Sequence, residues 1–280
     1  MLTIFTSPKP FRANNKTIQT NAIQSWSLLH PEGEIILFGN DEGTAEAAAG
    51  FKARHIPQVE CNDAGTPLIS SMFKIAQDTA RHPLVGYVNA DIILMSDFLP
   101  AVQRIPWRKF LLIGRRWDIK VESPLDFSHP DWEKELRSRL LQEGRLHPPT
   151  GIDYFVFPRG QYQNIPPFAV GRPGWDNWTI YRTRAMKIPV IDATKAITAV
   201  HQNHDYAHHP QGLAGVWQGD EARQNRALIG GYNRIFDVRD ATWNLDKTRL
   251  SRVSPLRGPC RQGRRLAESL VRVLWRFSGA

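Results

Sequence analysis

The chain has 280 residues, 41% of them apolar, which is enough to bury the core of one large domain, and its two cysteines are too far apart to indicate a disulfide framework or a structural zinc site. Six of the nine net positive charges fall within 252–276, so the rest of the chain carries no basic stripe and no nucleic-acid partner is expected. Since no apolar run reaches the roughly 18 to 20 residues of a membrane span and the N-terminus does not read as a signal peptide, the expected location is the cytoplasm.

The first half of the chain alternates apolar runs with segments of helical period. Continuous apolar strands separated by helices predict a mostly parallel, Rossmann-like sheet with helices on both faces, an α/β architecture. The strands are expected at 2–6, 34–39, 55–60, 84–94 and 109–119, and the helices at 17–29, 43–51 and 66–80. In such sheets ligands bind outside the carboxyl ends of the strands, which predicts where a functional site would lie.

The second half is less regular. A helix is expected at 131–144, a strand at 153–158, a helix from Trp175 onward and a strand at 189–202. The segment 203–225, rich in Gly, His and polar residues and without a clear period, is interpreted as a mobile loop. We expect one domain over residues 1–250 and a basic tail over 251–280.

The stretch "YVNADIILMSDF" ends a strand with a polar pair, Asn89 and Asp91. One residue apart on an extended backbone, the two side chains point to the same face. Oxygen ligands at this spacing suit a hard cation such as Mg²⁺ or Mn²⁺. The structural alternative is that Asp91 caps the following turn.

The segment "GRPGWDNWTIY" places Asp176 between Trp175 and Trp178 at the start of a helix. Aromatic faces beside a carboxylate suit a sugar ring, and the carboxylate could act as a general base toward an attacking hydroxyl. The alternative is that both tryptophans belong to the core and that Asp176 caps the helix.

Histidines and arginines follow two further strands. Four histidines fall within 201–209, and His201, at a strand end, could complete a metal site begun by Asp91, although surface histidines in a polar loop are common. Arg115 and Arg116 follow the apolar "FLLI"; they suit bidentate contact with a phosphate, or pairing with a structural aspartate.

Taken together, these segments resemble the GT-A fold glycosyltransferases, the nucleotide-diphospho-sugar transferase superfamily. The chain is similar in particular to a group of bacterial and plant members without an established substrate. The resemblance covers roughly residues 1–210 and rests on the order of "FTSPKPF", "NAIQSW", "EIILFGNDEG", "GTPLISSMF", "YVNADIIL", "GRRWD" and "HQNHDYAH".

The resemblance implies roles for particular residues. In that superfamily a first strand-end loop and an acidic residue after the second strand hold the nucleoside, which matches Thr6, Ser7 and Asp41. The metal-binding D-x-D motif matches Asn89 and Asp91. Because an amide stands at its first position, the chain departs from the motif there, which weakens the expectation of metal binding without removing it.

Two later residues complete the set that the resemblance implies. Asp176 matches the catalytic base of inverting members, and His201, or with less support His204, matches a late metal ligand. Mn²⁺ or Mg²⁺ would then neutralise the departing diphosphate, with Arg115 or Arg116 nearby. The loop after His201 would close over the donor, and Trp175 and Trp217 would contact the acceptor.

The sequence therefore predicts a hexosyltransferase-like glycosyltransferase that moves a sugar from a nucleoside-diphosphate sugar to a glycan or lipid-linked acceptor, in envelope or surface glycan synthesis. Two alternatives stay open: a metal-dependent hydrolase built on the histidines, and a non-catalytic sugar-nucleotide-binding protein. The donor base, the sugar and the acceptor are not revealed by the sequence.

The tail has a pattern of its own. In 263–277 apolar residues share one helical face while four arginines lie largely elsewhere, which predicts a basic amphipathic helix. Such a helix suits an anionic membrane surface and would make the protein peripheral at the inner face of the membrane. The alternative is a helix that packs on the body with a solvated basic side.

Overall fold

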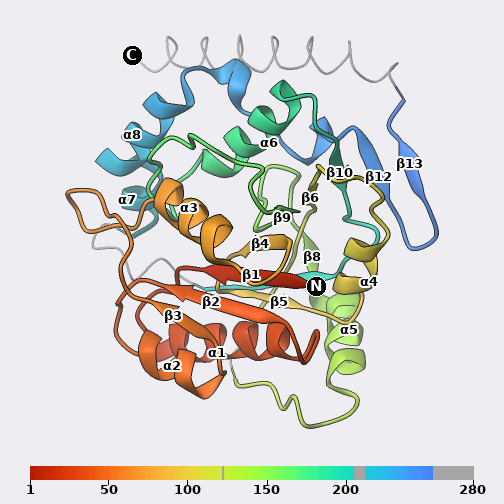
Figure 1. The fold of residues 1–280 in the computed structure, drawn as a ribbon. Helices are drawn as coiled ribbons and strands as arrows, with labels where there is room; N and C mark the ends of the chain where they lie inside the picture. Colours follow the sequence, from red (N-terminus) through yellow and green to blue (C-terminus); the bar gives the residue numbers. More distant parts are fainter. Residues whose placement is uncertain (122, 205–211, 255–280) are drawn as a thin grey trace, which may run out of the picture.

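The computed structural model describes residues 1–121, 123–204 and 212–254, which form an α/β domain around a nine-stranded sheet (Figure 1). In spatial order the strands of this large sheet are β13 (Leu250–Arg252), β12 (Trp243–Leu245), β10 (Val190–Asp192), β6 (Leu111–Ile113), β9 (Tyr154–Pro158), β4 (Leu84–Val88), β1 (Leu2–Thr6), β2 (Glu34–Phe38) and β3 (Arg54–Ile56).

Most of the large sheet is parallel, as predicted. The pairings β3·β2, β2·β1, β1·β4, β6·β10 and β10·β12 are parallel, whereas β9 runs antiparallel to both of its neighbours and β13 runs antiparallel to β12. The carboxyl ends of β1, β2, β4, β6 and β10 consequently lie along one edge. Side chains that follow these strands can meet there.

A second, four-stranded sheet was not predicted. Its order is β5 (Ile92–Leu94), β11 (Ala199–Gln202), β7 (Trp117–Ile119) and β8 (Arg145–Leu146). The long strands expected at 84–94, 109–119 and 189–202 are each broken in two: the first piece (β4, β6, β10) stays in the large sheet and the second (β5, β7, β11) joins the small one. The expectation of three continuous strands is therefore wrong.

The breaks have local causes. After β4 the chain turns so that the Ile92 N–H donates to the Asn89 carbonyl at 3.1 Å. After β6 stands Gly114, where a Cβ would collide with the hydroxyl of Tyr154. After β10 the N–H groups of Ala196 and Ile197 both donate to the Ala193 carbonyl, at 2.8 and 2.9 Å. Each break lies at the edge where a site was expected.

Helices cover both faces of the large sheet, as predicted. On one face lie α1 (Ala13–Ser27), α2 (Thr44–Gly50) and α4 (Phe98–Gln103); on the other lie α3 (Ile69–Thr79), α6 (Trp175–Ala185) and α8 (Asp220–Ile229) (Figure 1). Trp26 and Phe98 are buried on the first face, and Phe73 and Trp175 on the second. Burying each of the two phenylalanine side chains contributes about 1.5–3 kcal/mol. A further helix, α5 (Trp132–Glu143), packs on the small sheet.

The segment 203–225 is not a single loop, because α7 (Gly212–Gln218) and α8 occupy its second part. Helix α8 has two acidic residues, Asp220 and Glu221, in its first turn, where they complement the helix dipole, and it ends at Gly230 in the left-handed conformation (φ 77°). Two short 3₁₀ turns follow, η1 (Tyr232–Arg234) and η2 (Val238–Asp240).

The predicted tail helix lies outside the described residues. Among the residues that are described, no helix combines the length and the apolar character needed to cross a bilayer.

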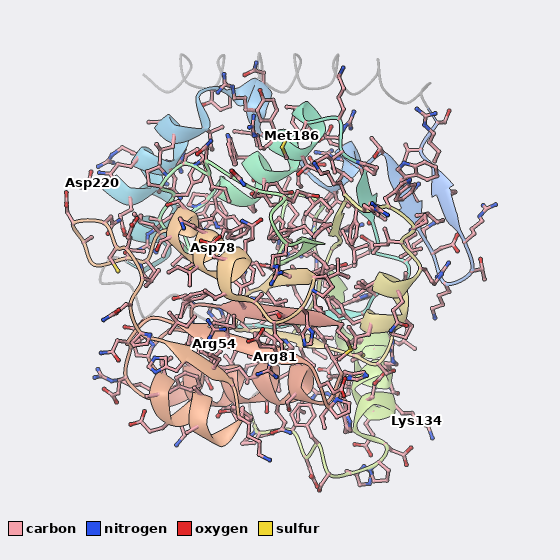
Figure 2. All side chains as sticks on the ribbon, in the orientation of Figure 1. Arg54, Asp78, Arg81, Lys134, Met186 and Asp220 are labelled. Atoms are coloured by element: carbon pink, nitrogen blue, oxygen red, sulfur yellow. The ribbon has the colours of Figure 1, made fainter. Side chains whose placement is uncertain are left out.

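The amino edge of the large sheet is closed by a buried carboxylate. Glu34, at the start of β2, accepts hydrogen bonds from the Thr3 hydroxyl at 2.7 Å and the Arg81 backbone N–H at 2.7 Å, and it pairs with the Arg54 guanidinium at 3.4 Å. Arg54 and Arg81 are labelled in Figure 2. Because these contacts satisfy both oxygens of Glu34, its carboxylate has a structural role.

Candidate functional site

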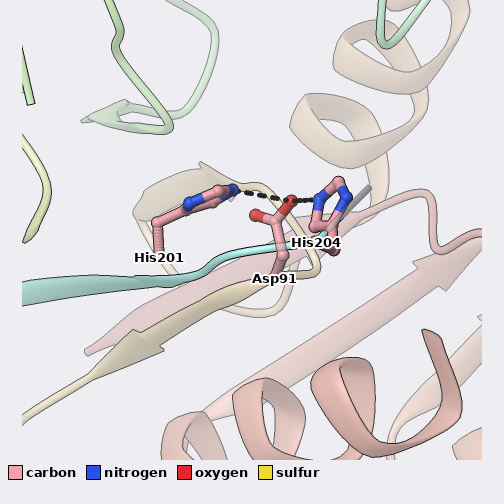
Figure 3. Close-up of side chains that lie close together, drawn as sticks. All are labelled: Asp91, His201 and His204. Atoms are coloured by element: carbon pink, nitrogen blue, oxygen red, sulfur yellow. Dashed lines mark hydrogen bonds and ion pairs between the residues drawn. The ribbon is translucent and has the colours of Figure 1, made fainter. Parts of the chain in front are cut away.

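The carboxylate of Asp91 lies between two imidazoles at the carboxyl edge of the large sheet (Figure 3). Oδ2 of Asp91 is 3.1 Å from Nε2 of His204 and 3.7 Å from Nε2 of His201. Asp91 follows β4, His201 lies in β11 and His204 follows β11. One ligand atom from each side chain lies within 4.8 Å of the other two, which is close enough for all three to hold one metal ion.

Asp91 is charged and incompletely satisfied. Burial opposes its ionisation, but the positive charges of protonated His201 and His204, the hydrogen bond from His204 and the charge of Lys9 outweigh burial and hold the pKa of Asp91 well below its usual range. Its second oxygen, Oδ1, is buried and has no hydrogen-bond partner within the described part of the chain. Such an atom costs about 1–3 kcal/mol unless a ligand or water meets it, so this oxygen is suited to bind a cation.

Backbone register places His201 at the site. In the small sheet His201 is the partner of Ile92 in β5 and of Asp118 in β7. The next residue, Gln202, is fully buried. Its side-chain amide donates to the Ile18 carbonyl at 2.8 Å and accepts from the Asn21 amide at 2.9 Å. These bonds join β11 to α1 and fix which side chain of β11 faces Asp91.

A second carboxylate, Asp118, lies behind His201. Its Oδ1 is 3.2 Å from Nδ1 of His201 and accepts from Nε of Arg116 at 3.0 Å, while its Oδ2 is 2.6 Å from Nδ1 of His147. Burial disfavours the charge of Asp118, but the hydrogen bonds from His201, His147 and Arg116 dominate and lower its pKa well below the usual range. The same carboxylates act on His201: although burial lowers the pKa of the imidazole, Asp91 and Asp118 raise it on balance.

A third carboxylate, Asp153, stands beside Asn89. The Asn89 amide donates to Oδ1 of Asp153 at 2.6 Å, and Oδ2 of Asp153 pairs with the Arg116 guanidinium. Asn89 and Asp91 therefore contact different partners. The expectation that they form one pair of cation ligands has no support in these contacts.

Asp176 lies in the first turn of α6, on the face of the large sheet that α3 and α8 also cover. Gly174 precedes the helix at φ 102°, a conformation that favours glycine, and its N–H donates to Oδ1 of Asp176 at 3.1 Å. Burial, with a smaller contribution from the charge of Asp153, raises the pKa of Asp176 to about 7. Burial together with the charges of Asp91, Asp153 and Asp176 raises the pKa of Tyr87, so all three carboxylates lie within electrostatic reach of that phenol.

No protein-family model matches the sequence, and no curated protein does. Comparison with solved structures finds glucosyl-3-phosphoglycerate synthase of Mycobacterium tuberculosis at 15% identity, over 84% of this chain and 80% of that chain, with a TM-score of 0.49. A structure of the same enzyme with Mg²⁺ and uridine diphosphate matches at 17% identity, over 84% and 79% of the two chains, with a TM-score of 0.48. Another, with Mn²⁺, uridine-diphosphate-glucose and phosphoglyceric acid, matches at 17% identity, over 83% and 79%, with a TM-score of 0.48.

The residues predicted to hold a nucleoside lie at two neighbouring strand ends. Thr6 is the last residue of β1; it is fully buried, and its hydroxyl has no hydrogen-bond partner within residues 1–121, 123–204 and 212–254. Ser7 lies against Gly39, where a Cβ would be 3.6 Å from its hydroxyl oxygen. Asp41 is exposed two residues further on. Their role in binding a nucleoside stays a prediction.

The two predicted arginines differ in their contacts. Arg115 donates from Nε to the His147 carbonyl at 2.6 Å and from Nη2 to the Leu146 carbonyl at 3.3 Å, so it ties β8 to the site. Arg116 is paired with Asp118 and Asp153, which is the structural alternative that the sequence left open.

The two predicted acceptor contacts also differ. Trp175 is 5% exposed and packs edge-on against Tyr87 with ring centroids 5.0 Å apart, so it belongs to the core and offers little surface to a sugar. Trp217 lies in α7, not in a loop, and is 47% exposed. Of the two, only Trp217 has an accessible ring.

Sequence reasoning missed Asp118, His147 and Asp153. Asp118 stands two residues after Arg116, a spacing that brings both side chains to one face of an extended strand and could have identified the pair. Asp153 stands directly before the apolar "YFVFP". Asp153 contacts Asn89 because β9 pairs antiparallel with β4, and no local sequence pattern predicts that pairing.

Proposed function

We propose that this chain is a GT-A-like glycosyltransferase that uses a divalent cation to bind a nucleoside-diphosphate sugar and transfers the sugar to an acceptor hydroxyl. The observation that carries the proposal is the Asp91 carboxylate, with an unsatisfied buried oxygen, between the imidazoles of His201 and His204 at the carboxyl edge of a mostly parallel sheet. Ligands of doubly wound sheets bind at this edge.

The donor set supports a cation that accepts both oxygen and nitrogen. Mg²⁺ prefers oxygen ligands and near-octahedral geometry, while imidazole suits softer divalent ions. One carboxylate and two imidazoles therefore favour Mn²⁺ over Mg²⁺. When bound, the cation would offset the negative charge that develops on a departing diphosphate.

Besides the cation, basic side chains near the site could offset the negative charge of the diphosphate. Arg116 is already balanced by two carboxylates, and Arg115 binds backbone carbonyls. Lys9, in the loop after β1, makes a small contribution to lowering the pKa of Asp91 through its positive charge. We infer that Lys9 helps to bind the phosphates.

Asp176 is the proposed general base. A base works best when its pKa lies near the working pH, and the value of about 7 raised by burial meets that condition. Removing a general base typically lowers turnover by roughly 10²- to 10⁴-fold.

Thermal stability measured with a panel of nucleoside diphosphates, with and without Mn²⁺, tests donor binding. We expect one nucleoside diphosphate to raise Tm only when Mn²⁺ is present, and Asp91→Asn to abolish the shift. Asp78→Asn, which makes the same change on the exposed face of α3, should keep the shift (Figure 2). If no member of the panel shifts Tm, donor binding, and with it the proposal, is wrong.

Product analysis separates transfer from the alternatives. The same protein is incubated with sugar nucleotides, including UDP-glucose, and candidate acceptors. Acceptor-dependent release of the nucleotide supports a transferase. Release of free sugar at the same rate without any acceptor indicates a hydrolase, and tight binding without turnover indicates a binding protein.

The acceptor and the place of action rest on the sequence of the tail. Seven arginines against one acidic residue within 252–276, with apolar residues at helical spacing, favour an anionic membrane surface and hence a lipid-linked or envelope glycan acceptor. Cosedimentation with phosphatidylglycerol vesicles tests this. The full chain should bind, removal of residues 255–280, which leaves β13 intact, should release it, and equal binding by both would contradict the membrane role.

A further inference from the structure

The two ring nitrogens of His201 face two different carboxylates. Nε2 is 3.7 Å from Oδ2 of Asp91, and Nδ1 is 3.2 Å from Oδ1 of Asp118 and 3.3 Å from the side-chain oxygen of Asn203, a neutral and weaker acceptor on the same side of the ring. A neutral imidazole carries its proton on only one nitrogen, and the other nitrogen holds the lone pair that can bind a metal. His201 can therefore bind the proposed cation through Nε2 only if its proton is on Nδ1.

The position of Asp118 relative to His201 is set by the backbone. The two residues are register partners on the parallel strands β7 and β11, and their side chains are only 18% and 13% exposed. The carboxylate is therefore held next to Nδ1 by the sheet rather than by a flexible loop.

Asp118 is itself held in place from behind. Nδ1 of His147 lies 2.6 Å from its Oδ2, and Nε of Arg116 donates to its Oδ1 at 3.0 Å. The His147 backbone N–H donates to the Arg116 carbonyl at 2.9 Å, which fixes the two supporting residues relative to each other. With both oxygens engaged, the carboxylate cannot turn away from His201.

We propose that Asp118, supported by His147, is a positioning residue that keeps the His201 proton on Nδ1 and turns the Nε2 lone pair toward Asp91. The inference rests on the proposed function for the identity of the metal site, but the contacts that carry it join His201, Asp118 and His147 directly. Outer carboxylates of this kind orient the ligating histidine and raise its basicity, and their loss typically weakens metal binding roughly 10- to 100-fold.

Asp118→Asn is the direct test. It keeps the volume of the side chain but replaces one acceptor oxygen with an NH₂ donor, so that one of the three groups now bound to the carboxylate must meet a donor. Mn²⁺ affinity, measured by electron paramagnetic resonance without nucleotide, should fall about 10- to 100-fold. The control Asp78→Asn should bind Mn²⁺ as the parent protein does.

The tautomer of His201 provides a readout that needs neither metal nor nucleotide. Long-range ¹H–¹⁵N correlation spectra of the apo protein, at a pH where the imidazole is neutral, should show the Nδ1–H form in the parent protein. In Asp118→Asn they should show a gain of the Nε2–H form. A parent His201 that is already in the Nε2–H form would overturn the proposal, whatever the metal measurements give.

A second variant guards against loss of folding. His147→Leu leaves Asp118 in place but removes its support, so it should shift Mn²⁺ affinity in the same direction as Asp118→Asn and by less. Unchanged Mn²⁺ affinity in a folded Asp118→Asn protein would also overturn the proposal. If the parent protein binds no Mn²⁺ at all, the proposed function loses its metal, while the tautomer measurement still decides the role of Asp118.

Discussion

The side-chain amide of Asn89 donates a hydrogen bond to Oδ1 of Asp153 at 2.6 Å, and its backbone N–H donates to the Asp153 carbonyl at 2.9 Å. Asp153 has a side chain only 8% exposed. The amide at the first position of the N-x-D stretch thus satisfies a buried carboxylate. This contact gives a structural reason for an amide at position 89.

Asn89→Asp, which restores the D-x-D pattern, should therefore destabilise the protein. The substitution would replace the hydrogen bond from Asn89 to Asp153 with two carboxylates in contact. Their like charges raise the pKa of one of the two groups and lower the free energy of unfolding by about 1–3 kcal/mol. Urea unfolding at pH 8 measures the loss, which should shrink toward pH 4 as a carboxyl group takes up a proton. Tighter Mn²⁺ binding at unchanged stability would show that Asn89 faces the cation instead.

The cation site makes a prediction about metal preference. Because two of the three candidate ligands are imidazoles, Mn²⁺ should bind more tightly than Mg²⁺. His204→Ala should reduce this preference along with the affinity, while Asp91→Asn should reduce binding of both ions. Calorimetric titration of the parent and the two variants measures these affinities. If His204→Ala binds Mn²⁺ and Mg²⁺ with the same affinities as the parent protein does, His204 is not a ligand.

The raised pKa of Asp176 predicts a pH dependence of stability. A carboxyl group that holds its proton more tightly in the folded state stabilises the fold fully below its unfolded pKa of about 4. That contribution is lost as pH rises toward the folded value of about 7. Asp176→Asn removes the loss, so its Tm relative to that of the parent protein should rise by a few degrees between pH 4 and pH 8. A flat difference would show that the pKa of Asp176 is not raised.

Gly114→Ala tests the break between β6 and β7. A Cβ at this position would collide with the buried hydroxyl of Tyr154 and lie 3.1 Å from the Thr194 backbone nitrogen, so the backbone must shift. Overpacking of this kind costs about 1–3 kcal/mol. Tm should fall. Gly160→Ala provides the comparison, because a Cβ at position 160 would meet no other atom within 4 Å and only the positive φ of that residue adds strain. Adding Tyr154→Phe should recover part of the Gly114→Ala loss.

Much of the fold could be predicted from the sequence because its signals are local. Apolar runs identified β1 and β2, and the charged periodic segment after residue 130 identified α5. Helix α8 was missed although its acidic first turn and terminal Gly230 are local signals, because the Gly- and His-rich residues before it dominated the interpretation.

The site was only partly predictable. Asp91 and His201 were expected at strand ends, and the structure places Oδ2 of Asp91 3.7 Å from Nε2 of His201. The contacts that decide their chemistry come from strand pairings between distant parts of the chain, such as β7 with β11. Nothing in the sequence shows that an apolar run such as 84–94 changes from one sheet to another at its polar residues.

The buried amide of Gln202 has a consequence for how the chain tolerates insertions. Successive residues of a strand face opposite sides, so a slip of one position in β11 would turn His201 away from Asp91 and present Val200 or Gln202 instead. The Gln202 side chain donates a hydrogen bond to the Ile18 carbonyl and accepts one from the Asn21 amide, and both bonds oppose that slip. The Gln202 side-chain amide also lies 3.2 Å from the Asp91 carbonyl oxygen, so one buried residue that is not itself a proposed metal ligand fixes the strand register of the site. We therefore expect an insertion within β11 to disrupt the site even if the sheet still forms.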